Sequence, residues 1–352
     1  MTRAHNRMRS PSANGHLSRR SLLAALPAAL LAPRVRAQAS PIPVRSITHV
    51  ALHVGNVRRS VDFYQALFGM PIQARVGPSV LLRVGQGPQF LSISPAGATP
   101  TRIARFGFGV ADFDPDRVLG ELNAHGVAAG AAGADGLAGG PMHARVITRG
   151  ETRELYLADP EGVELQLQDP TYCGGGGPLG ASCPAPEPVA AQGRLALQGF
   201  SHLTIFVSDA TRENDFYQSV FGLDVQASQG PGAPLLGVGP GVEFVMFAGG
   251  GGGRRGGGPP RPASIHHACM TVEGFDVEGI LGRLEQAGIR RRPEGQLDAP
   301  PLISYVSMRM PNRGGAPGGT PELYFTDPDG LLMQLQDVRY CGGGGVLGET
   351  CG

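Results

Sequence analysis

The sequence predicts an α+β protein built from four modules of the order β-α-β-β-β, arranged as two related halves. Two internal repeats predict this organisation. The segment Val61–Gly69, which contains Asp-Phe-Tyr, returns at Asn214–Gly222 with an offset of 153 residues. The segment Glu154–Gly162, which ends in Asp-Pro-Glu-Gly, returns at Glu322–Gly330 with an offset of 168. Self-similarity over so many residues indicates duplicated structural units.

Each half divides again into two modules. In the first module, apolar alternation predicts an opening strand, an amphipathic helix carrying Phe63 and Leu67, and further strands. The second module repeats this order, and the third and fourth begin at Phe200 and Ile265. A module of this size cannot cover both faces of its sheet, so we expect paired modules to curl as mixed sheets around a cavity. The elements expected in the first half are strands at 47–54, 80–84, 90–93, 103–110, 154–157 and 163–168, and helices around 61–69 and 116–125.

The composition excludes several classes of function. The 352 residues contain no lysine, so a Schiff-base lysine and a phosphate-binding loop with its lysine are both absent. Seven of the 30 arginines precede residue 40, where no acidic residue lies. The remaining chain therefore carries 23 basic and 29 acidic side chains, a net charge of −6. Binding to nucleic acid, which needs a basic surface, is not expected.

Residues 1–39 have the features of an export signal. Arg19 and Arg20 precede a short apolar run, and small residues follow at Ala37-Gln38-Ala39. A basic region, an apolar region too short to span a bilayer and a small-residue cleavage site are typical of a signal peptide. The paired arginines resemble the twin-arginine export motif. This implies passage through the twin-arginine translocon, a periplasmic or secreted location and no stable membrane anchor, and the alternative is an N-terminal helix that stays on the protein.

The spacing of the cysteines is consistent with an exported protein. Cys173 and Cys183 enclose one glycine-rich loop, and Cys341 and Cys351 enclose another with the same separation. In an oxidising compartment each pair is expected to form a disulfide, and a two-cysteine metal clip is the alternative. Cys269 is left over, as buried filler or as a residue of the pocket wall.

The strand order, the Asp-Phe-Tyr helix and the Asp-Pro-[Glu/Asp]-Gly turn resemble the vicinal oxygen chelate superfamily, which includes glyoxalases, fosfomycin-resistance proteins, bleomycin-binding proteins and extradiol dioxygenases. The four-module form resembles the two-domain extradiol dioxygenases or a fused glyoxalase. The resemblance implies two chelate domains at 46–172 and 199–340. A loop and linker at 173–198 would join them, and a Cys/Gly-rich loop at 341–352 would follow.

The resemblance also implies where a metal would bind. In the second half, His202, His267 and Gln334 stand at the positions of the two histidines and the carboxylate that hold Fe(II) in extradiol dioxygenases. Fe(II) is the metal that the resemblance favours, with Zn, Mn or Ni as alternatives. Gln334 departs from the family's glutamate, and an amide is a weaker, neutral ligand. The family's acid-base histidine is also missing from the segment before Tyr324.

The first half differs at these positions. His49 and Gln166 are accompanied there by Arg105, whose fixed charge repels a cation and could neutralise an acidic ligand. We expect a degenerate or purely ligand-binding site in this half. A plainer interpretation makes His49 and His202 ordinary core histidines.

Four other residues have more open roles. Tyr156 and Tyr324 are candidates to donate to a substrate oxygen, or they pack at the start of their strands. His266 precedes His267, and strand alternation predicts that only His267 faces the cavity. His53 shares a face with His49 and has no assigned role.

Together these features predict an exported metal-dependent enzyme for a small molecule with two neighbouring oxygens, such as a catechol or a dicarbonyl. The alternative is a metal-free protein that binds and sequesters a small ligand. The two glutamines and the missing histidine favour the binder. The histidine pair and the export signal favour the enzyme. A structural protein that uses the cysteine loops as contacts is a third class.

Overall fold

A computed structural model describes residues 40, 42–131, 136–249 and 262–351. The predicted signal peptide at 1–39 lies outside the described residues. No helix among the described residues is long and apolar enough to cross a membrane.

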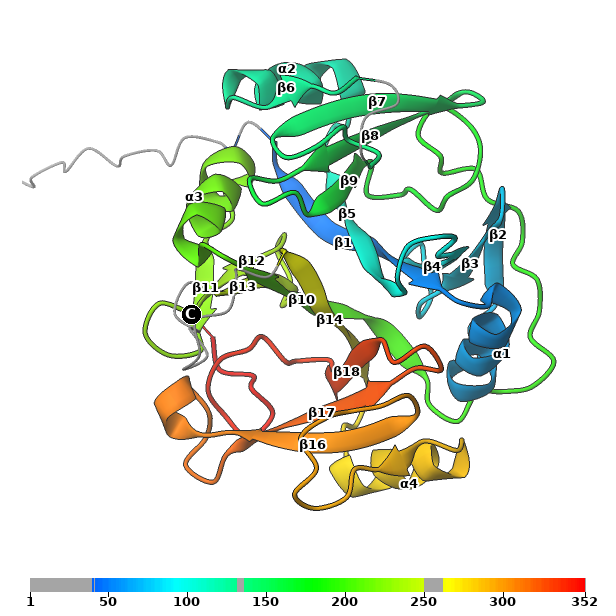
Figure 1. Ribbon diagram of the computed structural model, residues 1–352, viewed down its shortest axis with the longest axis vertical. Coiled ribbons are helices and arrows are strands. Elements are labelled where there is room, and N and C mark those ends of the chain that lie inside the picture. Colours follow the sequence, from blue (N-terminus) through cyan, green and yellow to red (C-terminus); the bar gives the residue numbers. More distant parts are fainter. Residues whose placement is uncertain (1–39, 41, 132–135, 250–261, 352) are drawn as a thin grey trace, which may run out of the picture. The chain divides into compact units, whose positions relative to one another are not determined.

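The first half forms one nine-stranded sheet in the order β2-β3-β4-β1-β5-β9-β8-β7-β6 (Figure 1). Its strands are β1 (Val44–Val54), β2 (Ile72–Val76), β3 (Ser79–Arg83), β4 (Phe90–Pro95), β5 (Arg102–Val110), β6 (Ala128–Ala129), β7 (His143–Arg149), β8 (Thr152–Ala158) and β9 (Glu164–Gln168). Its helices are α1 (Val57–Phe68) and α2 (Pro115–Ala124).

The second half repeats this sheet in the order β11-β12-β13-β10-β14-β18-β17-β16-β15. Its strands are β10 (Leu197–Val207), β11 (Val225–Ser228), β12 (Pro234–Gly237), β13 (Phe244–Gly249), β14 (Ser264–Val272), β15 (Arg290–Arg291), β16 (Ile303–Arg309), β17 (Thr320–Thr326) and β18 (Leu332–Asp337). Its helices are α3 (Ala210–Phe221), α4 (Val277–Gln286) and the 3₁₀ turn η1 (Pro311–Arg313). The predicted fold class, an α+β protein of paired βαβββ modules in two domains, is confirmed.

The two modules of each half join through their opening strands. β1 pairs antiparallel with β5, and β10 pairs antiparallel with β14. β9 and β18 then add in parallel to β5 and β14. The opening and closing strands that the sequence marked for site residues therefore lie next to one another at the middle of each sheet.

The repeated helix begins and ends through local chemistry. In α1 the Asn56 side chain accepts a hydrogen bond from the Arg59 amide and caps the first turn. Gly69 then ends the helix in the left-handed conformation, at φ +64°, where a residue without Cβ is favoured. Between them, Tyr64 and Leu67 turn a buried face to the core.

The two repeated sequence motifs bind one another across the halves. In the Asp-Pro-Asp-Gly turn of the second half, Asp327 accepts a hydrogen bond from the Tyr64 hydroxyl of α1, at 3.2 Å. In the turn of the first half, Asp159 accepts from the Tyr217 hydroxyl of α3, also at 3.2 Å. All four of these side chains are buried, so the exchange of contacts belongs to the core between the halves.

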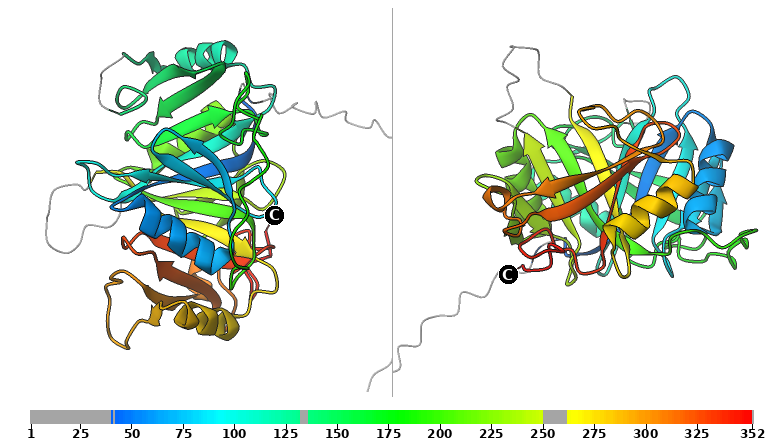
Figure 2. Two further views of the ribbon diagram at one scale, coloured as in Figure 1. Left: turned by 90° about the vertical axis from the view of Figure 1, so that its right-hand side faces the viewer. Right: turned by 90° about the horizontal axis from the view of Figure 1, so that it is seen from below.

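The acidic residue two positions further along each turn adds to this exchange. Asp329 accepts from the Gly55 amide and the Arg59 guanidinium at the start of α1. Glu161 accepts from the Ser208 amide and the Arg212 guanidinium at the start of α3. A carboxylate at a helix N-terminus is stabilised by unpaired backbone N–H groups and by the helix dipole. Each half thus caps a helix of the other, and Figure 2 shows the two sheets from two further sides.

Both predicted disulfides are present. Cys173 is bonded to Cys183 and Cys341 to Cys351, each closing its glycine-rich loop. Cys269 is free and fully buried on β14. Its position fits the interpretation as buried filler, because it is not among the residues that line the cavity described next.

Candidate functional site

Three donor atoms from the second half meet at the floor of a cavity. His202 on β10 places its Nε2 atom 3.3 Å from Nε2 of His267 on β14. The same His202 atom lies 3.1 Å from Oε1 of Gln334 on β18. The Gln334 side chain also interacts with His267. The structure therefore brings together all three residues that the sequence assigned to a metal.

These separations suit a metal polyhedron. Bonds of about 2.1 Å from a metal to nitrogen or oxygen put adjacent ligands roughly 3.0–3.4 Å apart, depending on the bond angle. Both observed distances fall in that interval. Within the described residues, no group of three or more histidine, cysteine or acidic side chains is placed to hold a metal, and the third donor here is instead an amide.

The other ring nitrogen of each histidine has its own partner. Nδ1 of His202 lies 3.0 Å from the Ser201 hydroxyl, and Nδ1 of His267 lies 2.8 Å from Nδ1 of His266. Such contacts fix the orientation of metal-ligating imidazoles. They leave Nε2 of both rings directed at the common centre.

Both imidazoles are neutral near pH 7. Burial lowers the pKa of His202 to about 3. Burial also places the pKa of His267 well below its usual range, with further lowering by His202 and His266. A neutral imidazole offers the lone pair that coordination requires.

The expectation that only His267 would face the cavity is wrong, because strand alternation fails at His266. β14 is irregular there: Thr204 pairs with His267, whereas the next residue, Ile205, pairs with Ile265. This shift leaves His266 as an extra residue in a β-bulge, which re-aims side chains. His266 consequently lines the cavity beside His267 and stacks on Phe206.

A buried carboxylate beside the triad was missed by the sequence reasoning. Glu322 on β17 is 4% exposed and lines the same cavity. It accepts hydrogen bonds from Tyr324 and Tyr340 and forms an ion pair with Arg309, whose side chain is fully buried. All its partners are therefore protein groups. The repeated Glu-Leu-Tyr sequence was the available signal, because Glu322 and Tyr324 are two residues apart on one strand and share a face.

This network also bears on Tyr324. Its hydroxyl donates to Glu322 at 3.1 Å, and its ring meets the His267 ring edge to face at 5.3 Å. Burial and the Glu322 charge hold the pKa of Tyr324 well above its usual range. The hydroxyl is thus a neutral group at the cavity wall whose proton is directed to Glu322.

The cavity above the triad has a volume of about 180 Å³. Its wall combines the donor triad with apolar side chains from β10 and β13 and with further polar residues. The lining residues are His202, Thr204, Phe206, Gln229, Met246, Ala248, His266, His267, Arg313, Glu322, Tyr324, Gln334 and Tyr340.

The equivalent residues of the first half also lie together. His49 on β1 interacts with the Gln166 side chain on β9 and with the charge of Arg105 on β5. Burial, followed by Arg105, lowers the pKa of His49 to about 3. Tyr156 donates to Glu154 at 2.9 Å, and Arg105 lies over the Tyr156 ring with 5.9 Å to its centroid. A guanidinium therefore occupies the place that His267 has in the second half.

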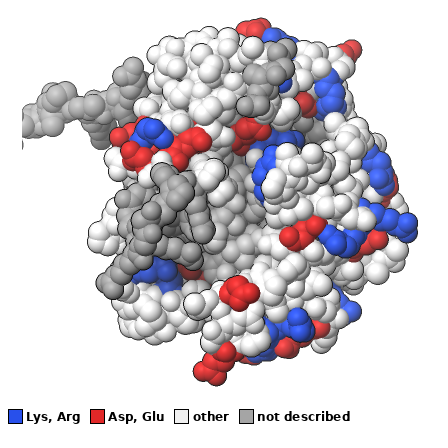
Figure 3. Space-filling view, in the orientation of Figure 1, with Lys and Arg blue, Asp and Glu red and all other residues white. Residues whose placement is uncertain are grey.

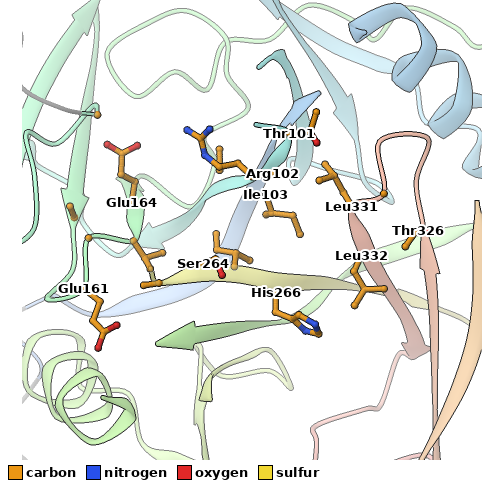
Figure 4. Close-up of a pocket in the computed structure, with 18 of the residues that line it drawn as sticks. Thr101, Arg102, Ile103, Glu161, Glu164, Ser264, His266, Thr326, Leu331 and Leu332 are labelled. Carbon is orange, nitrogen blue, oxygen red and sulfur yellow. The ribbon is translucent and has the colours of Figure 1, made fainter. Parts of the chain in front are cut away.

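A larger cavity of about 860 Å³ lies between the halves, with β5 and β14 along it (Figure 4). Its carboxylates are already engaged: Glu161 caps α3, and Glu164 accepts from the backbone N–H groups of Leu137 and Ala138. His266 lines both this cavity and the one above the triad.

On the face shown in Figure 3, positive and negative side chains are interspersed.

The two halves of the sequence match a known family. Residues 46–167 and 199–335 match the Glyoxalase/Bleomycin resistance protein/Dioxygenase superfamily, and the chain belongs to it. No curated protein sequence matches the chain.

Solved structures share the fold at low identity. A catechol 2,3-dioxygenase is 16% identical over 86% of this chain and 88% of its own, with a TM-score of 0.56. A Mn(II)-bound glyoxalase from Novosphingobium aromaticivorans is 15% identical over 84% of this chain and 82% of its own, with a TM-score of 0.53. Homoprotocatechuate 2,3-dioxygenase from Brevibacterium fuscum, in complex with 3,4-dihydroxyphenylacetate, is 14% identical over 85% of this chain and 83% of its own, with a TM-score of 0.56.

Proposed function

We propose that the protein is an exported enzyme whose second half uses a divalent metal to act on a small molecule with two neighbouring oxygens. The observation that carries this proposal is the convergence of His202, His267 and Gln334 at 3.1–3.3 Å. The solved structures that share the fold include a Mn(II)-bound glyoxalase, which supports a divalent metal of this general kind.

The residues present fit such an ion. Two neutral imidazoles and an amide oxygen supply three donors on one side, and the open cavity lies on the other. When bound, the metal would act as a Lewis acid that polarises the substrate oxygens. With a neutral glutamine in the third place, the ion keeps its full positive charge, so an anionic chelating substrate is favoured.

Other residues of the chain would hold and orient the substrate. Phe206 and Met246 give the cavity apolar wall for a flat carbon skeleton. Glu322 accepts a hydrogen bond from Tyr324 and can hold that hydroxyl in place beside the substrate, while the buried Arg309 pairs with the same carboxylate. The sequence prediction of a substrate-orienting Tyr324 is retained here as a proposal.

Metal content tests this proposal directly. The full chain, purified without chelators, is expected to contain about one divalent ion, and His267→Ala is expected to lose it. His49→Ala is the matched control from the first half and should retain the ion. If the parent and both variants are equally free of metal and bind a small ligand equally, the protein is the metal-free binder instead.

That second function rests on a specific observation. The Gln334 Nε2 atom is buried and has no hydrogen-bond partner, so the amide offers a donor as well as an acceptor to a ligand. A catechol or dicarbonyl oxygen would satisfy it without a metal. Retention of catechol by a metal-free parent, measured by equilibrium dialysis, would select this function.

Export is proposed from the twin-arginine segment together with the two disulfides, which persist in oxidising compartments. Replacing Arg19 and Arg20 with lysine should leave uncleaved precursor in the cytoplasm. Normal export of that double variant would exclude the twin-arginine route.

A further inference from the structure

The first half concentrates buried nitrogen atoms that have no hydrogen-bond partner. Five such side-chain nitrogens occur in the described chain, and four of them are in the first half. The four are Nδ1 of His53, Nε of Arg105, Nε of Arg145 and Nε2 of Gln166. A buried polar group without a partner costs free energy, so a ligand that offers acceptors to these nitrogens would be stabilised.

These side chains share one face of the first sheet. His49 lies opposite Gly107 in the β1–β5 pairing, and Ala51 lies opposite Arg105. Gly107 in turn lies opposite Gln166 in the β5–β9 pairing. Alternation puts His53 on the same face as His49. Tyr156 extends this face, because it pairs with Gln166 on one side and with Arg145 on the other.

The charge of this face is positive and uncompensated. Arg105 makes no ion pair with any described residue. Burial, followed by the charges of Arg102 and Arg105, lowers the pKa of His53 to about 4. The carboxylates next to this face are already hydrogen-bonded to other groups of the protein. Glu154 accepts from Arg149, Tyr156 and Tyr172, and Glu164 turns to two backbone N–H groups.

The residues next to Arg105 are smaller than those next to His267. Ser92 and Ala51 stand where the second half has Met246 and Thr204. His53 and Arg105 are only partly buried, and a solute can therefore reach them from the solvent. Gln166 interacts with His49 and Tyr172, and its amide nitrogen makes no hydrogen bond of normal geometry.

We propose that the first half binds a small organic carboxylate at Arg105 and Gln166, with His53 and Arg145 beside it. The guanidinium is a fixed planar donor that matches a carboxylate, and the amide N–H₂ adds a neutral donor. The same positive charge excludes a metal cation. This site is independent of the proposed metal site, because the two lie on different sheets.

Calorimetric titration tests the proposal on the full chain, in a chloride-free buffer of low ionic strength, with benzoate and acetate as probes. We expect one binding event, weakened at least tenfold in Arg105→Met. Arg58→Met removes the same charge from an exposed position of the first half and should leave the affinity unchanged. Gln166→Glu puts a carboxylate in the site and should abolish binding, and thermal unfolding verifies that each variant is folded.

Each result decides the question. Benzoate or acetate binding that both site variants lose and Arg58→Met keeps supports the site. No binding to the parent, or equal affinity in the parent, Arg105→Met and Gln166→Glu, overturns it. Should Arg105→Met fail to fold, Gln166→Glu alone carries the test. Binding of inorganic phosphate in place of both carboxylates would overturn the ligand class.

Discussion

The two halves share a strand order, yet the same point of the sheet carries opposite chemistry in each. In the second half, His267 completes a set of three neutral donors with His202 and Gln334. In the first half, Arg105 stands there and turns the set into a group of hydrogen-bond donors around a positive charge. In our two proposals, one residue on the central strand therefore separates a site for a cation from a site for an anion.

A second difference lies beneath the histidines. Gly107 follows Arg105 at the position that Cys269 has in the second half, and a Cβ atom at Gly107 would overlap the His49 ring. The His49 ring therefore lies closer to β5 than a larger residue would permit. His202 instead faces the fully buried Cys269. Both rings stack on the phenylalanine of the neighbouring strand, His49 on Phe90 and His202 on Phe244, with 4.8 Å and 4.3 Å between ring centroids.

The largest effect is expected when the arginine of the first half is placed at the equivalent position of the second half. His267→Arg is expected to abolish metal binding. At an effective dielectric of about 20, a unit charge about 4 Å from a divalent ion costs about 8 kcal/mol before relaxation. Elemental analysis of the folded variant measures the result, and metal retained at the parent stoichiometry would refute the assignment of His267.

The next largest effect is expected for the ion pairs Arg309–Glu322 and Arg149–Glu154. Their carboxylates accept hydrogen bonds from Tyr324 and Tyr156. Arg309→Met should cost about 3–5 kcal/mol of unfolding free energy, because it strands the buried Glu322. Arg149→Met, the matched change in the first half, should cost about 1 kcal/mol, since the Arg149 side chain is 32% exposed. Urea denaturation of both variants gives the two values, and equal losses would show that burial does not separate the pairs.

The disulfides should contribute about equally in the two halves. Each joins cysteines ten residues apart, for which loop closure predicts about 3 kcal/mol. Replacing both cysteines of one pair with serine tests each loop separately by thermal unfolding. A much larger loss for Cys341 and Cys351 would indicate coupling to Arg309, which donates to the Gly343 carbonyl inside that loop.

The smallest expected effect concerns pH and the exchange of contacts between halves. Glu213 stands where the first half has Ser60, and burial, with the charges of Asp159 and Glu161, raises the pKa of Glu213 to about 9. Burial likewise raises the pKa of Asp159 to about 7. A raised folded-state pKa gives stability that is complete below the unfolded value near pH 4 and is lost as the pH rises through the folded value.

Glu213→Gln cannot ionise, so its stability should fall less than that of the parent between about pH 4 and pH 9. Asp215→Asn, exposed on the same helix, is the control. Urea denaturation at several pH values measures the difference. An unchanged slope in Glu213→Gln would remove this carboxyl as the cause.

The sequence was sufficient for the fold because the evidence for it is local and repeated. The repeated segments and the apolar alternation mark the elements, and the equal cysteine spacing marks the two closed loops. His202, His267 and Gln334 followed from the resemblance and converge in the structure. Their register depends only on neighbouring strands.

The remaining features depend on contacts that no local pattern contains. The bulge at His266 changes which side chains reach the cavity, and alternation alone cannot reveal it. The Tyr64 to Asp327 contact spans 263 residues. Both partners were visible as motifs, but their pairing requires knowing how the halves meet. The unpartnered nitrogens of the first half likewise become visible only when the positions of all possible acceptors are known.

The exchanged helix caps have an evolutionary consequence. Because each turn binds the other half's helix, the halves are related as the subunits of a twofold dimer would be, in which one surface patch serves twice. In such a dimer a single gene dictates both sites, and any change at one appears at the other. Joining the copies in one chain ends that obligation, so an arginine can be selected in one copy while a histidine is kept in the other. The shared interface holds both copies in place while their sites diverge.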